Sequence, residues 1–250
     1  MKTLLLAAGI GQRLGNVSAN LPKCLLEFSG KTLLQRHLGN LKHFGVNEII
    51  IITGHRSDLV EQEITRTGYD AHIRIVRNPD YRKGSIISML LGLQVLVNEP
   101  DFILMDADVL YDYRILERLL NTRHQNCFLL DRKFEQGEEP VKLCVRDGQL
   151  IEFRKKIDDN LEFDYQGESV GFFRFNNATA GKLIQSANTY LARGEDTQPY
   201  EECIRDLLLL DPESFGFEDI TGLEWIEIDF PEDISKANTE VLPKILQLNQ

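Results

Sequence analysis

A short apolar run that breaks into a glycine-rich, positively charged turn constrains this chain more than any other feature. Residues 3–8 are almost wholly apolar, residues 9–15 read Gly-Ile-Gly-Gln-Arg-Leu-Gly, and Lys23 follows Pro22 a little further along. Small residues allow backbone N–H groups to approach an anion closely, and Arg13 and Lys23 add fixed positive charge. The pattern predicts a buried strand that leads into a binding site for the triphosphate of a nucleotide.

Two well-known glycine motifs do not fit this segment. A Walker loop requires G-x-x-x-x-G-K-[ST], and the segment does not contain it. A Rossmann fingerprint requires a third glycine where Leu14 stands, and an acidic residue after the next strand, which here ends Ile52-Thr53-Gly54. An ordinary strand-to-helix turn is the plain alternative, but it leaves the combination of Arg13 and Lys23 unexplained.

Strand-like and helix-like segments alternate along the chain. We expect strands at 3–8, 46–53, 71–77, 102–105, 127–130, 169–175, 215–218 and 225–229, and a hairpin of 141–145 with 149–153. We expect helices at 33–44, 55–66, 85–97, 112–120, 178–191 and 201–210, and a last one from Pro231. Asp112 is expected to cap its helix, and the polar stretch 155–166 is expected to be a loop. The order predicts an α/β fold: one three-layer, Rossmann-like domain with a mixed, mostly parallel sheet.

The length and the charge narrow the class of protein. The 250 residues suit a single domain, which we divide into a nucleotide-binding half (1–130), an acceptor-binding half (131–230) and a C-terminal helix (231–250). A formal charge of −11 argues against nucleic-acid binding and against anionic membrane surfaces. Four separated cysteines and the lack of a membrane-spanning run indicate a cytoplasmic protein. A homodimer is compatible with the sequence, which does not fix the oligomeric state.

Two pairs of acidic residues stand at predicted strand ends, Asp106 with Asp108 and Glu227 with Asp229. Residues two apart on a strand share a face, and open α/β sheets bind ligands at the carboxyl ends of their strands. Carboxylates at this place suit Mg²⁺, which accompanies a triphosphate and prefers oxygen ligands. The plain alternative is that the acids are solvated strand ends, or that Asp229 caps the last helix.

The segment L-A-A-G-x-G-x-R-L followed by P-K resembles the signature of nucleotidyltransferases with a glycosyltransferase-A-like fold. The chain is most similar to the phosphocholine cytidylyltransferase-like branch, through segments 22–26, 84–88, 105–111, 167–171 and 225–229. The resemblance implies a nucleotide-diphospho-sugar transferase fold and CTP as the nucleotide. It also implies that Asp108 and Asp229 are metal ligands, with Glu227 assisting.

The expected reaction needs no general base, because the acceptor phosphate or phosphonate is already an anion. Its oxygen attacks the α-phosphorus of the nucleotide, and pyrophosphate leaves. Lys23 is expected to neutralise the α-phosphate and Arg13 to hold the departing pyrophosphate. The five histidines are interpreted as structural or solvated.

The nucleotide is expected to lie over the small residues of the first strand and its turn. The predicted nucleotide-binding residues are Leu6, Ala7, Ala8, Gly9, Gly11, Asn78, Ser85 and Ser88. Ser85 is included because a serine at the start of a buried helix contributes to the nucleoside pocket in related cytidylyltransferases. An N-cap is the equal and compatible alternative for Ser85.

The acceptor pocket is expected in the second half of the chain, where acidic and aromatic residues suit a cationic amine. The predicted acceptor-binding residues are Glu168, Tyr200, Glu201 and Trp225, with Tyr165 and Phe172 as further candidates. Phe172 and Trp225 are open to the alternative that they are core aromatics. Two other functions stay open: a sugar-1-phosphate nucleotidylyltransferase that uses UTP, GTP or dTTP, and a non-catalytic nucleotide-binding module.

Overall fold

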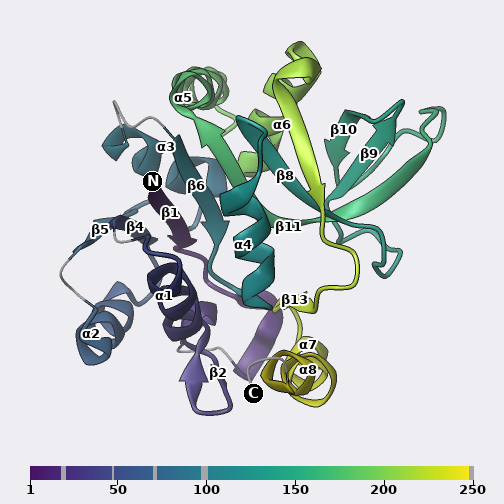
Figure 1. The fold of residues 1–250 in the computed structure, drawn as a ribbon. Coiled ribbons are helices and arrows are strands. Elements are labelled where there is room, and N and C mark those ends of the chain that lie inside the picture. Colours follow the sequence, from purple (N-terminus) through teal and green to yellow (C-terminus); the bar gives the residue numbers. More distant parts are fainter. Residues whose placement is uncertain (18–20, 47, 70–71, 97–100, 248–250) are drawn as a thin grey trace.

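The computed structural model describes residues 1–17, 21–46, 48–69, 72–96 and 101–247 (Figure 1). The strands are β1 (Lys2–Ala7), β2 (Glu27–Phe28), β3 (Lys31–Thr32), β4 (Glu48–Thr53), β5 (Ile73–Arg77), β6 (Asp101–Asp106), β7 (Val109–Tyr111), β8 (Asn126–Asp131), β9 (Lys142–Arg146), β10 (Gln149–Arg154), β11 (Tyr165–Asn176), β12 (Phe215–Asp219) and β13 (Trp225–Glu227). The helices are α1 (Leu33–His43), α2 (Ser57–Thr67), α3 (Ser85–Val95), α4 (Tyr113–Asn121), α5 (Asn177–Ala192), α6 (Tyr200–Leu210), α7 (Pro231–Lys236) and α8 (Leu242–Gln247). Short turns of 3-10 helix, η1 (Gln12–Val17), η2 (Lys23–Leu25) and η4 (Pro212–Ser214), and a π-helical turn, η5 (Ala237–Val241), complete the order.

A nine-stranded mixed sheet joins the two halves of the chain. Its main path runs β10-β9-β11-β6-β1-β4-β5, and β8 pairs with both β11 and β12. Strands β6, β1, β4 and β5 are parallel, whereas β11 runs antiparallel to β6, β8 and β9. This confirms the predicted α/β fold, with antiparallel strands added in the second half.

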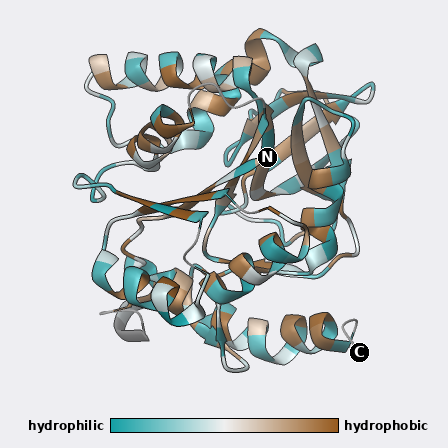
Figure 2. Cartoon of the chain, turned by 60° about the vertical axis from the view of Figure 1, so that its left-hand side comes forward, coloured by the Kyte–Doolittle hydropathy of each residue, from teal (hydrophilic) through white to brown (hydrophobic). Residues whose placement is uncertain are grey.

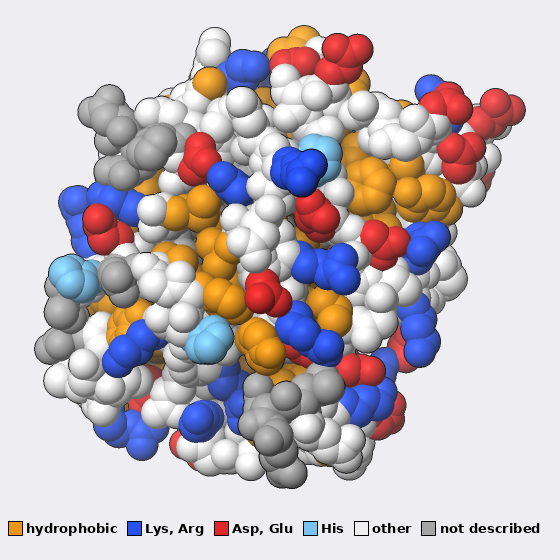
Figure 3. Space-filling view, viewed as in Figure 1, with side chains coloured by type: hydrophobic (Ala, Val, Ile, Leu, Met, Phe, Trp, Pro, Cys, Tyr) orange, Lys and Arg blue, Asp and Glu red, His pale blue; other side chains and the backbone are white. Residues whose placement is uncertain are grey.

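Helices cover both faces of the sheet, as Figure 2 shows, with apolar strands between the helical layers. Successive side chains of β1 point to opposite faces of the sheet, so the strand contributes to the core on both faces. Leu4 packs in the core under α3, α5 and α6, whereas Leu5 packs in the core under α1, α2 and α4. None of the described helices has the length and apolar character needed to cross a membrane. Acidic and basic side chains are interspersed over the face shown in Figure 3.

The end of the chain packs against its beginning. Ile228, Val241 and Ile245 form one buried cluster with Leu14 and Phe28, so η5 and α8 support the segment that carries the glycine-rich turn. In Figure 1, α7 and α8 accordingly lie beside the purple N-terminal segment. The division of the chain at 130 and 230 stays a prediction.

Most predicted elements are present, with shifted ends. Asp112 caps α4 as expected, and its side chain accepts a hydrogen bond from the N–H of Arg114. The predicted hairpin turn also forms, with Asp147 (φ 51) and Gly148 (φ 75) in the left-handed conformation. The polar stretch 155–166 was predicted as a loop, but β11 already begins at Tyr165. Residues 71 and 97, the predicted ends of a strand and a helix, lie outside the described residues.

Candidate active site

The glycine-rich turn forms one wall of a cavity of about 460 Å³. Gly11 adopts a left-handed conformation (φ 67), which a glycine accepts without strain, and its carbonyl accepts a hydrogen bond from the N–H of Leu14. The buried Leu14 side chain anchors the turn in the core. Arg13 and Lys23 both line this space, which we call the glycine-loop cavity.

Lys23 lies between two carboxylates. Its Nζ donates to Asp108 Oδ2 at 2.8 Å and to Asp229 Oδ1 at 2.5 Å. Burial alone would lower the pKa of Lys23, but the two carboxylates outweigh it and raise that pKa above its ordinary value. Lys23 therefore stays charged over the whole physiological range.

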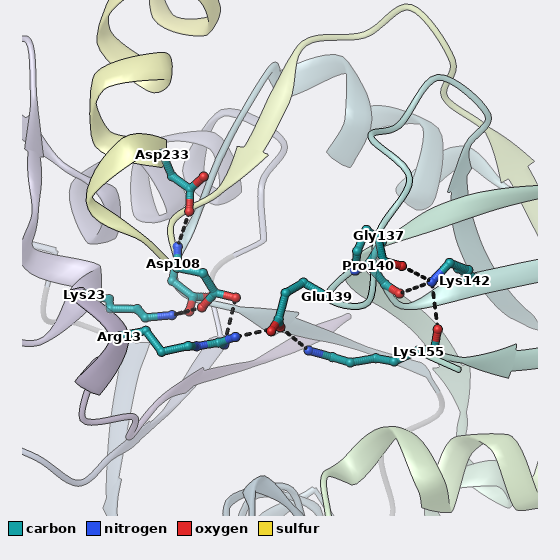
Figure 4. A network of polar contacts seen from close by, with 10 residues as sticks. Arg13, Lys23, Asp108, Gly137, Glu139, Pro140, Lys142, Lys155 and Asp233 are labelled. Atoms are coloured by element: carbon teal, nitrogen blue, oxygen red, sulfur yellow. Dashed lines mark hydrogen bonds and ion pairs between the residues drawn. The ribbon is translucent and has the colours of Figure 1, made fainter. Parts of the chain in front are cut away.

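Arg13 joins the same network beside Lys23 (Figure 4). Its guanidinium donates to Asp229 at 2.8 Å and to Glu139 at 2.6 Å, and it lies 5.1 Å from the ring centroid of Phe230. Glu139 also accepts a hydrogen bond from Lys155 at 2.9 Å. The two predicted phosphate-binding cations are thus both neutralised by carboxylates in the free protein.

Asp108, Glu227 and Asp229 form an acidic cluster whose oxygen atoms lie within 4.8 Å of one another. The register of β13 against β7 brings them together, because Glu227 is opposite Val109 and the N–H of Ile228 donates to the carbonyl of Asp108. Burial raises the pKa of Glu227 to about 8, and the charges of Asp108 and Asp229 add to the shift. Three clustered carboxylates repel one another when charged, and a divalent cation, which prefers oxygen ligands, would relieve that repulsion.

Asp229 is not the cap of the last helix. The carboxylate of Asp233 accepts hydrogen bonds from the backbone N–H groups of Asp229 and Phe230 and satisfies the start of α7 instead. The side chain of Asp229 is therefore available to Lys23 and Arg13.

Asp106 has a different environment from Asp108. Tyr200 donates to it at 2.6 Å, and a Cβ at Gly171 would lie only 2.4 Å from its Oδ2. Burial, with the charge of Asp108, raises the pKa of Asp106 well above its ordinary value. The expectation that both acids face one side fails because β6 ends at Asp106 and a turn follows.

The predicted nucleotide-binding residues divide into two groups. Leu6, Ala7, Gly9 and Gly11 line the glycine-loop cavity together with Arg13 and Lys23. Ala8 is buried, and its carbonyl accepts a hydrogen bond from the N–H of His55. Asn78 and Ser88 are also buried, and Asn78 Nδ2 donates to Ser88 Oγ at 2.9 Å, so the two side chains bond to each other and do not line the cavity.

Ser85 is not the N-cap of α3, which is Gly84. The Ser85 hydroxyl accepts a hydrogen bond from the backbone N–H of Tyr200 at 3.0 Å, at the first turn of α6. The reason is the close approach of the two helix starts: a Cβ at Gly84 would lie 2.0 Å from the carbonyl oxygen of Gln198. Ser85 therefore satisfies an orphan donor of a neighbouring helix.

A second, larger cavity of about 730 Å³ lies on the acceptor side, and we call it the acidic cavity. Glu168 and Trp225 line it with Glu227 and Asp229. Trp225 Nε1 donates to Asp131 Oδ2 at 2.9 Å, and Glu168 is directly opposite Asp131 across β11 and β8. Burial raises the pKa of Glu168 to about 7, and Asp131 adds to the shift.

The other predicted acceptor residues are placed differently. Tyr200 is buried and its hydroxyl is bonded to Asp106, so it supports the site from behind. Glu201 has a buried Oε2 without a hydrogen-bond partner, and burial raises its pKa to about 7. Phe172 is a fully buried core residue, in edge-to-face contact with Tyr111. Tyr165 lies beneath the guanidinium of Arg132, at 5.5 Å.

Some residues of the site gave no signal in the sequence. Glu139 and Lys155 belong to polar segments without periodicity, and only the tertiary structure brings them together with Arg13. Asp131 ends β8, directly after the predicted strand 127–130, and lines the acidic cavity, so its place at a strand end was a signal that could have been used. Tyr81 and Arg82 line the glycine-loop cavity from the segment before α3.

Comparison with known proteins agrees with this geometry. Residues 3–159, which carry the glycine-rich turn, Lys23 and Asp108, match the family described as MobA-like NTP transferase domain. The chain belongs to this family. All the residues that line the glycine-loop cavity lie within the region that matches the NTP transferase domain. Glu227 and Asp229, which line the acidic cavity, lie beyond that region.

Two relatives of this NTP transferase domain illustrate the range of similarity. The CMP-5'-(3-aminopropyl)phosphonate synthase of Streptomyces rubellomurinus is 27% identical, over 97% of this chain and 39% of the relative. The CTP:phosphoglutamine cytidylyltransferase of Campylobacter jejuni is 25% identical, over 74% of this chain and 76% of the relative. The chain thus spans well under half of the first relative's length.

Solved structures share the fold. The inositol-1-phosphate CTP transferase from T. maritima superimposes with a TM-score of 0.76 at 20% identity, covering 98% of this chain and 95% of the other. The CTP:phosphocholine cytidylyltransferase from Streptococcus pneumoniae gives 0.73 at 22% identity and covers 98% of both chains. These matches confirm the predicted fold class.

Proposed function

We propose that this protein transfers CMP from CTP to a small phosphate or phosphonate acceptor and releases pyrophosphate. One observation carries the proposal: Lys23 lines the glycine-loop cavity and bonds to Asp229, which lines the acidic cavity. A cation and an acidic cluster therefore stand where the two cavities meet, as a reaction between a nucleotide in one and an acceptor in the other requires.

The proposed reaction is a displacement at phosphorus. An acceptor oxygen forms a bond to the α-phosphorus of CTP, and the bond between that phosphorus and the bridging oxygen of pyrophosphate breaks. Lys23 neutralises charge on the α-phosphate as the transition state forms, and Arg13 with the N–H groups of the glycine-rich turn holds pyrophosphate. Positioning and charge neutralisation suffice, because the acceptor is already an anion.

The acidic cluster fits a divalent cation such as Mg²⁺. Asp108 and Asp229 would hold it with Glu227, since three carboxylates within 4.8 Å offer the oxygen ligands that Mg²⁺ prefers. A bound cation supplies neutralisation of phosphate charge. Lys23 would then leave these carboxylates and become available to the nucleotide.

The acidic cavity supports an acceptor that bears a cationic amine. Among the residues that the structure describes, eleven acids and three lysines line it, together with Phe134, Trp225 and Phe230. Glu168 is opposite Asp131, whose charge raises the pKa of Glu168 although Lys142 acts in the other direction, and an ammonium group would relieve the repulsion between the two carboxylates. Trp225 adds an aromatic ring beside them, which favours cations.

The names of the relatives agree with this class of acceptor. Aminopropylphosphonate and phosphocholine each combine an amine or ammonium group with a phosphonate or phosphate, whereas inositol 1-phosphate, named for the T. maritima structure, has no amine. CTP is the nucleotide named for the C. jejuni relative and for both solved structures. Four free, buried cysteines fit a reducing compartment, so we place the reaction in the cytoplasm. A homodimer stays a prediction.

A panel of nucleotides and acceptors tests the proposal. CTP, UTP, GTP and dTTP are each combined with 2-aminoethylphosphonate, phosphocholine, ethyl phosphate and glucose 1-phosphate, and released pyrophosphate is measured. We expect the highest rate with CTP and an amine-bearing acceptor. A preference for a hexose 1-phosphate would identify a sugar-1-phosphate nucleotidylyltransferase, and binding of a nucleotide without turnover would identify a binding module.

A further inference from the structure

Glu139 bridges two cations that come from different halves of the chain (Figure 4). Its Oε2 accepts a hydrogen bond from Arg13 at 2.6 Å and another from Lys155 at 2.9 Å. Arg13 belongs to η1 in the glycine-rich turn, whereas Lys155 directly follows β10. A single carboxylate oxygen thus fills a two-cation site of the kind that a phosphate oxygen occupies in substrate complexes.

Lys142 holds this arrangement in place. The residue is 8% exposed, and its Nζ donates to the carbonyls of Gly137 at 2.8 Å and Lys155 at 2.7 Å, with a longer contact of 3.4 Å to Pro140. One buried ammonium therefore ties the segment that carries Glu139 to the segment that carries Lys155. As a result, Glu139 is held within reach of Arg13 and Lys155.

The two carboxylates on Arg13 differ in how easily they can leave. The Asp229 side chain is 10% exposed and also bonded to Lys23, so it is fixed by its surroundings. The Glu139 side chain is 52% exposed and can turn into solvent at little cost. When a polyanion approaches Arg13, Glu139 is the partner that gives way.

We propose that Glu139 is an internal stand-in for a substrate anion: it occupies Arg13 and Lys155 in the free protein and is displaced by a phosphate oxygen of the incoming substrate. The inference rests on the proposed function, since it assigns Arg13 to a phosphate group. Glu139 competes with the nucleotide and, by repelling it while in place, weakens its binding. Displacement releases both cations together, and of the two Arg13 lines the glycine-loop cavity.

Glu139→Gln tests the competition, because glutamine keeps the size of the side chain and removes its charge. The variant loses the exposed ion pairs of Glu139 with Arg13 and Lys155 and the repulsion between Glu139 and the substrate anion. We therefore expect the dissociation constants of metal-free CTP and of inorganic pyrophosphate, measured by calorimetry, to fall roughly three- to tenfold. The KM for CTP should fall by a similar factor while kcat stays near the wild-type value, because Glu139 is absent from the substrate complex.

Glu138→Gln is the matched control, since Glu138 is the neighbouring residue and lines the same acidic cavity. It should leave the dissociation constants of metal-free CTP and of pyrophosphate near their wild-type values, because the nucleotide is proposed to bind in the glycine-loop cavity, which Glu138 does not line. An equal gain in affinity in both variants would mean that the effect comes from net charge alone, and it would overturn the inference. So would unchanged or weaker binding in Glu139→Gln, which is the result expected if Glu139 orients Arg13 for catalysis.

The two proposals fail in different ways. If CTP is not the substrate, the wild-type protein shows no turnover with CTP in the nucleotide panel, yet the pyrophosphate comparison between Glu139→Gln and Glu138→Gln is still decisive. If only the inference about Glu139 is wrong, the wild-type protein turns over CTP while the Glu139→Gln variant binds pyrophosphate no better.

Discussion

Replacing Lys23 by methionine keeps the length of the side chain and removes the charge that the proposed mechanism uses. In the free protein, this charge lies 2.8 Å from Asp108 Oδ2 and 2.5 Å from Asp229 Oδ1, and Glu227 belongs to the same cluster. Its removal leaves three carboxylates within 4.8 Å without their central cation. We expect two separate effects, one on the stability of the free protein and one on turnover.

The stability effect follows from the burial of the pair. Removing one partner of a fully buried ion pair costs about 3–5 kcal/mol, and the side chains here are 10–22% exposed, so we expect a loss of about 1–3 kcal/mol in the free energy of unfolding. For a chain of this size, that is a fall in Tm of roughly 3–10 °C. Because Lys23 and a divalent cation compete for the same carboxylates, Mg²⁺ should stabilise the Lys23→Met variant more than the wild-type protein.

The turnover effect is larger. Loss of a charge that acts mainly in the transition state lowers kcat on the order of 100-fold or more, with a smaller change in CTP binding. The assays are pyrophosphate release and thermal unfolding with and without Mg²⁺, with Lys31→Met as the control for an exposed lysine. Near wild-type turnover, or the same Mg²⁺ stabilisation in the Lys23→Met variant and the wild-type protein, would refute this role for Lys23.

Asp108→Asn and Asp229→Asn each remove a proposed metal ligand, so each should lower kcat by about 100-fold or more at saturating Mg²⁺. Normal turnover in both variants would exclude the acidic cluster as the metal site. Glu168→Gln should raise the KM for phosphocholine roughly five- to 100-fold, which is equivalent to about 1–3 kcal/mol, and should leave the KM for ethyl phosphate unchanged. An equal rise in KM for both acceptors would show that Glu168 does not contact the ammonium group. Since the pKa of Glu168 is about 7, its carboxyl gains negative charge as the pH rises from 6 to 8, so the KM for phosphocholine relative to ethyl phosphate should fall over that interval. A constant ratio of the two KM values would contradict this. Because the pKa of Glu168 is raised from 4.5 to about 7, the folded protein holds one more proton than the unfolded chain between about pH 4.5 and pH 7, and it loses stability as the pH rises through that range. Glu168→Gln should therefore raise the Tm relative to the wild-type protein at about pH 8 but not at about pH 4.

The sequence is sufficient to predict the fold because its local patterns agree with the tertiary structure. The strand of residues 3–8, the cap at Asp112 and the turn at 147–148 are each encoded by short-range chemistry, and each forms as expected. Arg13 and Lys23 also lie together at one cavity, since a single short segment carries both.

Other parts of the site depend on contacts that a sequence pattern does not contain. Asp106 and Asp108 were expected on one face, but a strand that ends at Asp106 gives them different partners. Ser85 was expected as a cap or a ligand contact, whereas its hydroxyl bonds to the start of α6, a contact set by the close approach of the two helices. Glu139 reaches Arg13 across 126 positions of sequence, and no period or motif marks such a pair.

The most direct test of the central claim is the identity of the products. CTP, Mg²⁺ and 2-aminoethylphosphonate are incubated with the protein, and the mixture is followed by phosphorus NMR. We predict one equivalent of free pyrophosphate for each CMP joined to the phosphonate through a new P–O–P linkage, with coupling between the two phosphorus atoms of the product. Formation of CDP and inorganic phosphate, or of CMP without a link to the acceptor, would contradict the proposed transfer.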